Sequence, residues 1–413
     1  MIIAILGGGG REHALCNKIS KSTKAKKIFC IPGNAGTSKI ATNIDINLDN
    51  FDELKEFLQK SKVDLVIVGP EKQLVNGIVD YLDNYNIKTF GPTKKSSQLE
   101  GSKIFTKQIC EKYNIPTAKF GIFKNIKEAS EFLKKTEMPI VIKADGLAAG
   151  KGVYICETLS EAQNATKDIF EGKFGLAKNI LVEEFLSGDE MSYFIISDGK
   201  TFKNFNTAQD HKRIFDGDKG KNTGGMGAYS PTGAIDDVLA EKIQTKIIRK
   251  TVDSLKKEGI VFKGFLYAGV MIRDGEPYVL EFNARMGDPE CQPMVIRMNS
   301  DLFEYLTAVT DGNLSSLPPM SWKKQSAVCV VLASNGYPES YPKNEEITGL
   351  SDIPKDSFVF HAGTKDVSGQ IVTNGGRVLS VTSLGDSLQD AISNTYKAAE
   401  KISWPSKYYR HDI

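Results

Sequence analysis

The chain has 413 residues, and its 53 basic and 51 acidic side chains leave a net charge of +2. This balance excludes the strongly basic surface of a nucleic-acid-binding protein, and the length is sufficient for several domains. Six cysteines without close pairs and only four histidines argue against a disulfide framework or a zinc site. The apolar run at 2–6 is too short for a signal-peptide core, and no stretch is long enough to span a membrane. We therefore expect a reduced, cytoplasmic protein with no membrane partner.

The first hundred residues alternate strand patterns with helix patterns. Strands are predicted at 2–6, 28–31, 65–68 and 89–90, with helices from about residue 11, near 51–59 and near 74–85. This order is typical of a doubly wound parallel α/β sheet, in which ligands bind at the carboxyl ends of the strands. Those ends carry the candidate substrate contacts Gly9, Gly10, Arg11, Glu12, Asn34, Gly36, Thr37 and Glu71.

The loop after the first strand is a poor match to a dinucleotide-binding fingerprint. Glu12 stands where the third glycine belongs, and the strand ending at residue 31 leads into Pro32 rather than an acidic ribose ligand. The glycines instead open a helix beside Arg11, which suits a single phosphate. Tight turns alone are the alternative, and they leave Arg11 and Glu12 unexplained.

A lysine-bearing, glycine-rich stretch lies at 140–153. The apolar run 140–142 predicts a buried strand ending on Lys143, and Gly146, Gly150 and Gly152 leave a loop that can close on a polyphosphate. Lys151 adds a second cation, but a P-loop is excluded because a glycine follows it in place of Ser or Thr. The alternative is a flexible surface hairpin that carries lysines.

On either side of this stretch, charged residues occupy positions that are energetically unfavourable in a predicted helix and a predicted strand. The segment 101–118 predicts a helix with Lys103 in its first turn, where the helix dipole disfavours a cation unless an anion compensates. A strand predicted at 180–185 is interrupted by Glu183 and Glu184, one of which is expected to face a ligand. A solvent-facing strand edge is the alternative for this pair.

The segment 208–231 is polar, rich in glycine and long for a connection, which indicates function or disorder. Asp210, Lys212, Arg213 and Gly225 within it are expected to surround a small charged substrate. His211 is interpreted more readily as a structural residue than as a catalyst.

A hairpin is predicted at 264–290, with Asp274 and Gly275 in its turn. Glu281 and Asn283 fall on one face of the second strand, where their oxygens suit magnesium. Arg285 takes the next position of that face and can reach a terminal phosphate. A buried strand with satisfied polar groups is the weaker alternative, because unpaired polar groups there would be costly.

The last unit, from about residue 322, is interpreted mostly as scaffold. Strands are predicted at 326–333, 358–362 and 376–382, followed by an amphipathic helix at 388–402. An approach of Lys365 or Arg377 to the active cleft is the less favoured alternative.

Together these segments resemble the ATP-grasp ligases and, among them, the phosphoribosylamine-glycine ligase family. The matching motifs are GGREHAL (9–15), PGNAGT (32–37), VGPE (68–71), FGPT (90–93), LEGSK (99–103), IKADGLAAGKGV (142–153), VEEFLSGDE (182–190), QDHKR (209–213), NTGGMGAYSP (222–231) and EFNARMGDPE (281–290). The resemblance implies a doubly wound N-terminal domain at 1–100, an ATP-grasp domain at 101–320 with an α+β lid at about 117–190, and a mixed α/β C-terminal domain at 321–413.

The resemblance also implies the ligands: ATP with Mg²⁺ or Mn²⁺ between lid and body, and glycine and 5-phosphoribosylamine as substrates. The implied ATP contacts are Lys103, Lys143, Gly146, Lys151, Gly152, Glu183, Glu184, Leu186 and Glu190, with Glu183 beside the adenine and Glu190 beside the ribose. Glu281 and Asn283 would hold the metal. Substrate contacts would be Asp210, Lys212, Arg213, Gly225 and Asp288, besides those at the N-terminal strand ends. Arg285, Lys143 and Asp210 would be catalytic, and the reaction would pass through glycyl phosphate.

Three alternatives stay open. Another ATP-grasp carboxylate ligase, such as a biotin carboxylase, is opposed by the motifs at 209–213 and 222–231. A nicotinamide-dependent oxidoreductase is opposed by Glu12, and a non-catalytic nucleotide-binding regulator by Lys143, Glu281 and Arg285. The strand 264–272 lacks the second acidic metal ligand of many ATP-grasp enzymes, and the chain ends at Ile413, earlier than many relatives. We expect a monomer that can receive phosphoribosylamine directly from the enzyme that forms it.

Overall fold

The computed structural model describes residues 1–147, 152–173, 175 and 178–413. Its N-terminal part is a parallel sheet in the order β3-β2-β1-β4-β5. The strands are β1 (Ile2–Gly7), β2 (Lys27–Pro32), β3 (Thr42–Asn43), β4 (Leu65–Val68) and β5 (Thr89–Phe90), with α1 (Gly10–Ile19), η1 (Thr37–Lys39), α2 (Phe51–Lys60), α3 (Glu71–Asn76) and α4 (Ile78–Asp83) between them. The predicted doubly wound sheet is confirmed.

The single helix predicted near 74–85 is wrong. The structure has α3 and α4 instead, separated by Gly77, whose φ of 91° lies in the left-handed region. A glycine in that conformation terminates a helix, so the chain turns before the second helix begins.

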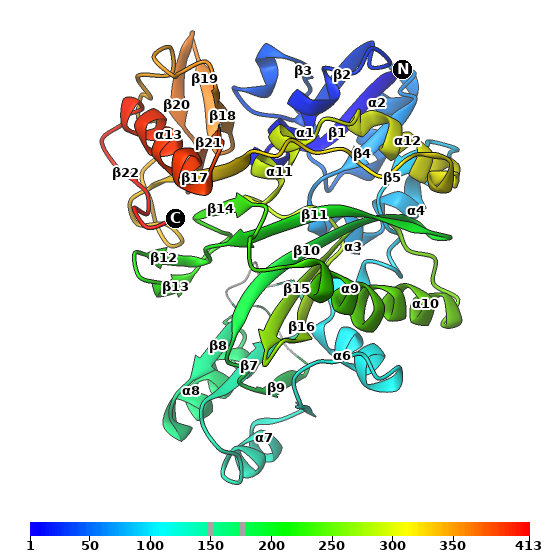
Figure 1. The fold of residues 1–413 in the computed structure, drawn as a ribbon, viewed down its shortest axis with the longest axis vertical. Helices are drawn as coiled ribbons and strands as arrows, with labels where there is room; N and C mark the ends of the chain where they lie inside the picture. The colour runs from blue at the N-terminus through cyan, green and yellow to red at the C-terminus, as the bar shows by residue number, and fades with distance from the viewer. Residues whose placement is uncertain (148–151, 174, 176–177) are drawn as a thin grey trace.

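A small antiparallel sheet in the order β6-β9-β7-β8 follows. Its strands are β6 (Phe120–Phe123), β7 (Ile140–Ala144), β8 (Val153–Cys156) and β9 (Ile180–Glu184), and its helices are α7 (Ile126–Leu133) and α8 (Leu159–Phe170). Apolar side chains of both helices share a core with β7 and β9. This unit, which we call the lid, lies at the opposite end of the molecule from the N-terminal sheet (Figure 1).

A nine-stranded sheet forms the body, in the order β16-β15-β10-β11-β14-β17-β21-β18, with β22 paired to β17. Its strands are β10 (Asp189–Asp198), β11 (Phe202–Asp210), β14 (Gly227–Ser230), β15 (Lys263–Arg273), β16 (Glu276–Asn283), β17 (Ser326–Ser334), β18 (Ser357–His361), β21 (Arg377–Gly385) and β22 (Lys407–Tyr408). The pairing of β14 with β17 joins the C-terminal strands to the central ones. The predicted hairpin is confirmed, because β15 pairs with β16 around Asp274 and Gly275.

Helices and two short hairpins complete the body. The helices are α5 (Gln98–Gly101), α6 (Lys103–Lys112), α9 (Asp237–Ile243), the π-helical η2 (Gln244–Arg249), α10 (Lys250–Lys257), α11 (Cys291–Arg297), α12 (Leu302–Asp311), η3 (Leu314–Ser316) and α13 (Leu388–Lys401). The hairpins are β12 (Arg213–Phe215) with β13 (Lys219–Asn222), and β19 (Thr364–Val367) with β20 (Gln370–Thr373). The polar segment 208–231 is therefore largely built of short strands.

Strand β10 is buried on both faces because helices cover the sheet from both sides. Phe194 and Ile196 belong to one core cluster with residues of α12, while Tyr193 and Ile195 belong to another with residues of η2 and α10. Successive side chains of a strand point to opposite faces, so β10 supplies both clusters. The six cysteines are buried and free. Within the described residues, no helix combines the length and apolar character needed to cross a membrane.

Candidate active site

Strand β7 delivers Lys143 into a buried chain of charges. Lys143 Nζ lies 2.9 Å from Glu183 Oε1, and Glu183 Oε2 lies 3.0 Å from Lys107 Nζ. The side chains of Glu183 and Lys107 are each 2 % exposed. Lys107 also donates to Thr117 Oγ1 at 2.6 Å. Glu183 therefore orients two lysines, and its interpretation as part of a solvent-facing edge is wrong because β9 lies between β6 and β7.

Lys103 approaches the same place from the start of α6. Its Nζ donates to the carbonyl oxygen of Gly146 at 3.0 Å. Burial lowers the pKa of Lys103, with Glu281 opposing the shift and Lys143 adding to it. The structure thus brings Lys103 and Lys143 together, as the sequence predicts.

The N-terminus of α6 has an anion of its own, which the sequence reasoning missed. Asp145 accepts hydrogen bonds from Ile104 N at 3.2 Å and from Ser102 Oγ at 3.0 Å. A carboxylate at this end of a helix offsets the positive end of the dipole. The unfavourable position of Lys103 is therefore partly compensated within the chain.

The glycine loop of the lid is described only at its two ends. Gly146 has a φ of +102° and an added Cβ there would meet nothing within 4 Å. At the other end, Gly152 O accepts from Ala144 N at 2.8 Å. Lys151 and Gly150 lie outside the described residues.

The remaining nucleotide candidates lie on β9 and the start of β10. Glu184 exchanges hydrogen bonds with Lys119, its backbone N–H donating to Lys119 O and its carboxylate accepting from Lys119 N, both at 2.9 Å. Leu186 is buried. Glu190 Oε1 lies 2.5 Å from Lys212 Nζ. The carboxylate of Glu190 thus lies at one edge of the lysine cluster.

The candidate metal ligands sit beside these lysines on β16. Lys212 Nζ is 3.3 Å from Glu281 Oε1, and Lys212 is the largest cause that lowers the pKa of Glu281, to about 2. Burial lowers the pKa of Lys212, but Glu190, Tyr267 and Glu281 more than offset it, so this pKa lies well above its ordinary value. Glu281 is ionised over the physiological range and faces several cations.

Arg285 links β16 to the N-terminal sheet. Its NH2 group is 2.8 Å from Glu100 Oε1, and its Nε is 3.3 Å from Glu71 Oε2. Glu71 Oε2 also lies 3.9 Å from Arg11 NH1, and both arginines donate to Met286 O at 3.1 Å. These contacts join two sites that the sequence treats separately.

The Arg11 side chain is buried and bonded to the neighbouring Glu12, so it is poorly accessible to a ligand. It is 6 % exposed, and its Nε lies 2.6 Å from Glu12 Oε1. The other oxygen of Glu12 accepts from Gly9 N at 2.8 Å. Gly10 is the first residue of α1 and is buried.

Asn34 and Thr37 hold the loop after β2 in place. Asn34 Nδ2 donates to Gly8 O at 2.9 Å and to His361 O at 2.7 Å, and its Oδ1 accepts from the backbone N–H groups of Gly36 and Thr37. Thr37 is 0 % exposed. Both side chains are committed to internal hydrogen bonds, so they shape the crevice from behind.

Asp210 contributes a buried carboxylate beside Lys212. Its Oδ1 is buried and has no hydrogen-bond partner among the described residues. Burial raises the pKa of Asp210 well above its ordinary value, and the neighbouring Glu290 raises it further. A Cβ on Gly225 would lie 2.8 Å from Asp210 Oδ1 and 2.4 Å from Pro289 Cδ. The sequence reasoning missed Glu290, whose proximity to Asp210 depends on the fold.

The two neighbours of Lys212 in the sequence turn to other contacts. His211 donates from its backbone to Gly227 O, and burial lowers the pKa of its ring. Arg213 NH1 donates to Gly220 O at 2.6 Å within its own hairpin. In the described part of the chain, neither side chain forms a hydrogen bond or ion pair with Lys103, Lys143 or Lys212.

A cavity of about 390 Å³ opens at the carboxyl ends of β1 and β2. Gly8, Gly9, Asp288, Thr364 and Arg377 are among the residues that line it. Arg377 NH2 is 3.4 Å from Asp288 Oδ2, and its NH1 donates to Gly224 O at 2.6 Å. Arg377 therefore lines this cavity, while Lys365 is not among the lining residues.

Comparisons with known proteins assign the chain. Family models described as phosphoribosylglycinamide synthetase match residues 1–100 (N domain), 101–291 (ATP-grasp (A) domain) and 327–413 (C domain). A phosphoribosylamine-glycine ligase of Caldanaerobacter subterraneus subsp. tengcongensis is 46 % identical over 415 residues, covering 100 % of this chain and 99 % of that protein. The chain belongs to the phosphoribosylamine-glycine ligase family.

Further relatives agree with this assignment. The ligase of Pasteurella multocida is 45 % identical, covering 100 % of this chain and 97 % of that protein. The crystal structure of the Thermotoga maritima ligase has a TM-score of 0.87 and 36 % identity over the full length of both chains. A biotin carboxylase domain from Hydrogenobacter thermophilus, at 16 % identity and a TM-score of 0.76, covers 98 % of this chain and shares the fold alone.

The predicted family and enzyme class are therefore confirmed: the chain is an ATP-grasp ligase that forms a C–N bond. Enzymes of the family act in purine biosynthesis and use ATP with Mg²⁺ or Mn²⁺. The oxidoreductase and biotin carboxylase alternatives are removed.

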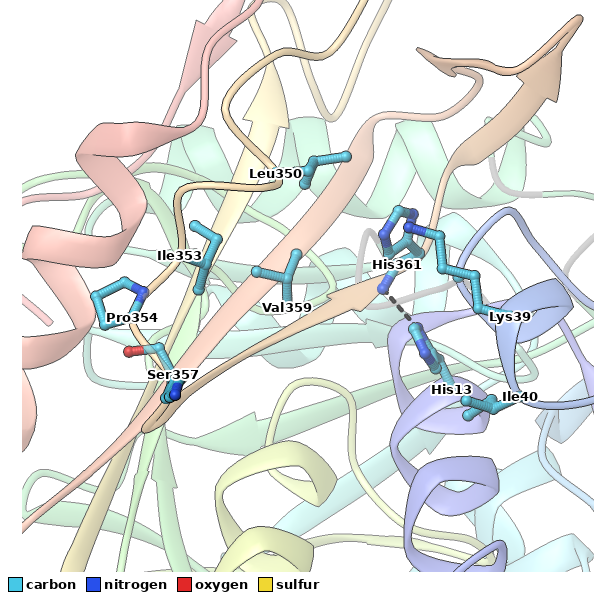
Figure 2. A pocket seen from close by; sticks show the side chains of 11 residues that line it. His13, Lys39, Ile40, Leu350, Ile353, Pro354, Ser357, Val359 and His361 are labelled. Atoms are coloured by element: carbon cyan, nitrogen blue, oxygen red, sulfur yellow. Dashed lines mark hydrogen bonds between the residues drawn. The ribbon is translucent and has the colours of Figure 1, made fainter.

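A second cavity, of about 340 Å³, has His13, Lys39 and His361 among its lining residues (Figure 2). The His361 backbone N–H donates to His13 Nδ1 at 2.8 Å, and His361 Nδ1 lies 3.0 Å from Thr364 Oγ1. Burial lowers the pKa of His13 to about 3, with His361 and Lys39 adding to the shift, and burial with Lys39 lowers the pKa of His361 to about 4. The two rings are neutral parts of a joint between α1 and β18.

This joint predicts a loss of stability in mild acid. The pKa of each histidine in the folded protein lies below the unfolded value of about 6.5. The contribution of the two histidines to the free energy of unfolding is therefore fully present above about pH 6.5 and is lost as the pH falls toward about 3 to 4. Each histidine adds up to about 1.4 kcal/mol per pH unit to the slope. The free energy of unfolding, measured with urea at pH 7.5, 6 and 5, should fall less steeply with decreasing pH in His13→Asn than in the unmodified protein. Asparagine keeps an acceptor near the position of Nδ1 but cannot titrate. An unchanged slope would contradict the assignment.

Proposed function

We propose that this protein joins the carboxylate of glycine to the amine of 5-phosphoribosylamine, forming glycinamide ribonucleotide, ADP and phosphate. The supporting observation is the convergence of Lys103, Lys143 and Lys212 on Glu281, beside Asp210 and next to the crevice at the ends of β1 and β2. Cations, a metal-binding carboxylate and a separate substrate crevice are the parts that phosphoryl transfer to a carboxylate requires.

ATP is proposed to lie between the lid and β16. Lys143 from β7 and Lys103 from α6 would bind phosphate oxygens, while Glu190 at the start of β10 would face the ribose. We propose that Glu183 positions Lys143 through the 2.9 Å contact, because its carboxylate is already bonded to two lysines. The backbone around Glu184 and Leu186 would then face the adenine.

Glu281 and Asn283 suit a magnesium or manganese ion. Both offer oxygen, and Glu281 is ionised because its pKa is about 2. No group of three or more His, Cys, Asp or Glu side chains suited to a metal occurs among the described residues, so the other ligands would be phosphate oxygens and water. A bound ion would supply positive charge where charge develops on the transferred phosphoryl group.

Glycine is proposed to bind with its ammonium group at Asp210. The unpaired Asp210 oxygen and the nearby Glu290 gain a partner from a cation, and both carboxyl groups would then favour the ionised form. The Cβ clash predicted at Gly225 indicates little room beside Asp210. Lys212 lies two residues after Asp210 and would face the glycine carboxylate.

The phosphoribosyl group is proposed to lie in the cavity lined by Gly8, Gly9, Asp288 and Arg377. Arg377 offers a guanidinium group to a phosphate, and the backbone N–H groups of the glycine loop add further donors. Arg11, Asn34 and Thr37 would support this crevice from behind, because their side chains are buried and already bonded.

The chemistry has two steps. A glycine carboxylate oxygen attacks the γ-phosphorus of ATP, and the bond between that phosphorus and the β,γ-bridging oxygen breaks. The products of this step are glycyl phosphate and ADP. The amine of phosphoribosylamine then attacks the carbonyl carbon, phosphate leaves, and the nitrogen loses a proton. Lys143 and Arg285 would stabilise charge on the transferred phosphoryl group.

The test is ADP release with Mg²⁺, glycine and phosphoribosylamine generated from ribose 5-phosphate and ammonia. We expect release to need both substrates and to match the glycinamide ribonucleotide formed. ADP release that is indifferent to glycine, or a product without glycine, would overturn the proposal.

We further infer a cytoplasmic monomer, with domains at 1–100, 101–320 and 321–413. Six free cysteines fit a reducing compartment. Phosphoribosylamine is unstable in water, so direct transfer from the enzyme that makes it would protect it. Sedimentation tests the monomeric state, and co-purification with the enzyme that forms phosphoribosylamine tests the transfer.

A further inference from the structure

Glu100 lies behind the proposed metal site and has no role in the function described above. It belongs to the short helix α5, and its side chain is 6 % exposed. Its Oε2 accepts from Ala284 N at 2.8 Å, and its Oε1 lies 2.8 Å from Arg285 NH2. A single buried carboxylate thus holds the chain at the end of β16.

The same carboxylate favours one orientation of the Asn283 amide. When Asn283 Nδ2 faces Glu100, it donates to Glu100 Oε1 at 3.2 Å and to Phe282 O at 3.1 Å. In the opposite orientation the amide oxygen would face these acceptors and the nitrogen would face only donors. Hydrogen bonding therefore favours the orientation in which the Asn283 nitrogen faces Glu100 and the oxygen lies on the other side of the amide.

A divalent cation binds the oxygen of an amide and not its nitrogen. The orientation of Asn283 consequently decides whether residue 283 can be a ligand. Glutamate suits this task because its two oxygens accept from three donors, whereas glutamine would place an NH₂ group against at least one of them.

We propose that Glu100 is a positioning residue for metal binding, which fixes the Asn283 amide with its oxygen turned away from Glu100 as a ligand for the cation while it holds Arg285 toward the phosphates. The inference rests on the proposed function, since Glu281 and Asn283 are proposed ligands. Lys103 lies three residues after Glu100 and contacts Gly146 of the lid, so one short segment touches the end of β16 and the glycine loop.

The test is Mn²⁺ binding in the presence of saturating ADP, measured by electron paramagnetic resonance, which needs no turnover. Groups that orient metal ligands typically contribute about 10- to 100-fold to metal affinity. We expect Glu100→Gln to weaken Mn²⁺ binding by that factor. The matched control is Glu71→Gln, which removes the other carboxylate beside Arg285 and should leave Mn²⁺ affinity within about threefold, because Glu71 has no contact with Asn283 among the described residues.

A reciprocal variant separates orientation from general support of the fold. In Glu100→Gln with Asn283→Asp, the new amide can donate to the new carboxylate, and either carboxylate oxygen can bind the metal. We expect Mn²⁺ affinity to recover to within about threefold of the unmodified enzyme. If Glu100→Gln alone fails to fold, the inference still requires the double variant to fold and to bind Mn²⁺.

Three results would overturn the inference: unchanged Mn²⁺ affinity in Glu100→Gln, equal losses in Glu100→Gln and Glu71→Gln, or no recovery in the double variant. The failure of the proposed function looks different. In that case the Glu281→Gln variant would bind Mn²⁺ as tightly as the unmodified enzyme does. The proposed metal site and the role of Glu100 would then both be wrong.

Discussion

Lys143→Met is expected to lower the turnover number by about a hundredfold to a thousandfold, the range for loss of one preorganised charge at a transition state. Lys143 is the penultimate residue of β7 and its ammonium group is paired with Glu183, while the neighbouring Lys103 is bonded to Gly146 O. Methionine keeps the length and apolar stem of lysine. ADP release at saturating substrates measures the effect.

Lys167→Met is the matched control for that variant. Lys167 also lies on the lid, but its side chain is 63 % exposed and its contact with Glu171 spans 3.7 Å. We expect turnover within about twofold of normal, because such surface pairs contribute little. A Lys143→Met enzyme that keeps turnover within threefold would remove Lys143 from the catalytic residues.

Lys107→Met is expected to reduce the free energy of unfolding by about 3 to 5 kcal/mol, the cost of breaking a buried ion pair from one side. Lys107 and Glu183 are each 2 % exposed, and Lys107 supplies one of the two cations bonded to that carboxylate. Urea unfolding at pH 7.5 measures the loss. We also expect lower activity, because Glu183 would no longer be held where it positions Lys143.

Two further variants define the cause. Lys112→Met removes another lysine of α6, whose pair with Glu258 is exposed, and should change stability little. Lys107→Met with Glu183→Met replaces both buried charges by apolar groups and should recover part of the stability but not the activity. Stability lost equally at Lys107 and Lys112 would contradict the role of the buried pair.

Local patterns predicted the architecture well. The strands that end near Leu6, Ile31 and Val68 are confirmed, because buried parallel strands produce short apolar runs between glycine-rich turns. The hairpin at Asp274 and Gly275 is confirmed for the same reason, since both residues adopt positive φ. The division of the helix near residue 77 was missed because glycine interrupts an otherwise helical pattern only when its backbone takes the left-handed form.

Partners distant in sequence could not be predicted from such patterns. Glu100 meets residues 184 positions away, and Arg377 contacts Asp288, which is 89 positions away. Each belongs to an ordinary helix or strand pattern, so periodicity gives no sign of its partner. Glu183 shows the same limit: the sequence places a carboxylate on a strand, but only sheet order puts that strand between β6 and β7.

The fold class, the family and the residue types at the ends of β7 and β16 could therefore be predicted from the sequence, because they depend on spacing within a strand and on turn chemistry. Which charges pair could be learned only from the folded chain. Folding joined Lys107 to Glu183, Glu100 to Ala284 and Arg285, and Arg11 to Glu71. The physical reason is that a charge is buried only with a partner, and packing of separate elements selects that partner.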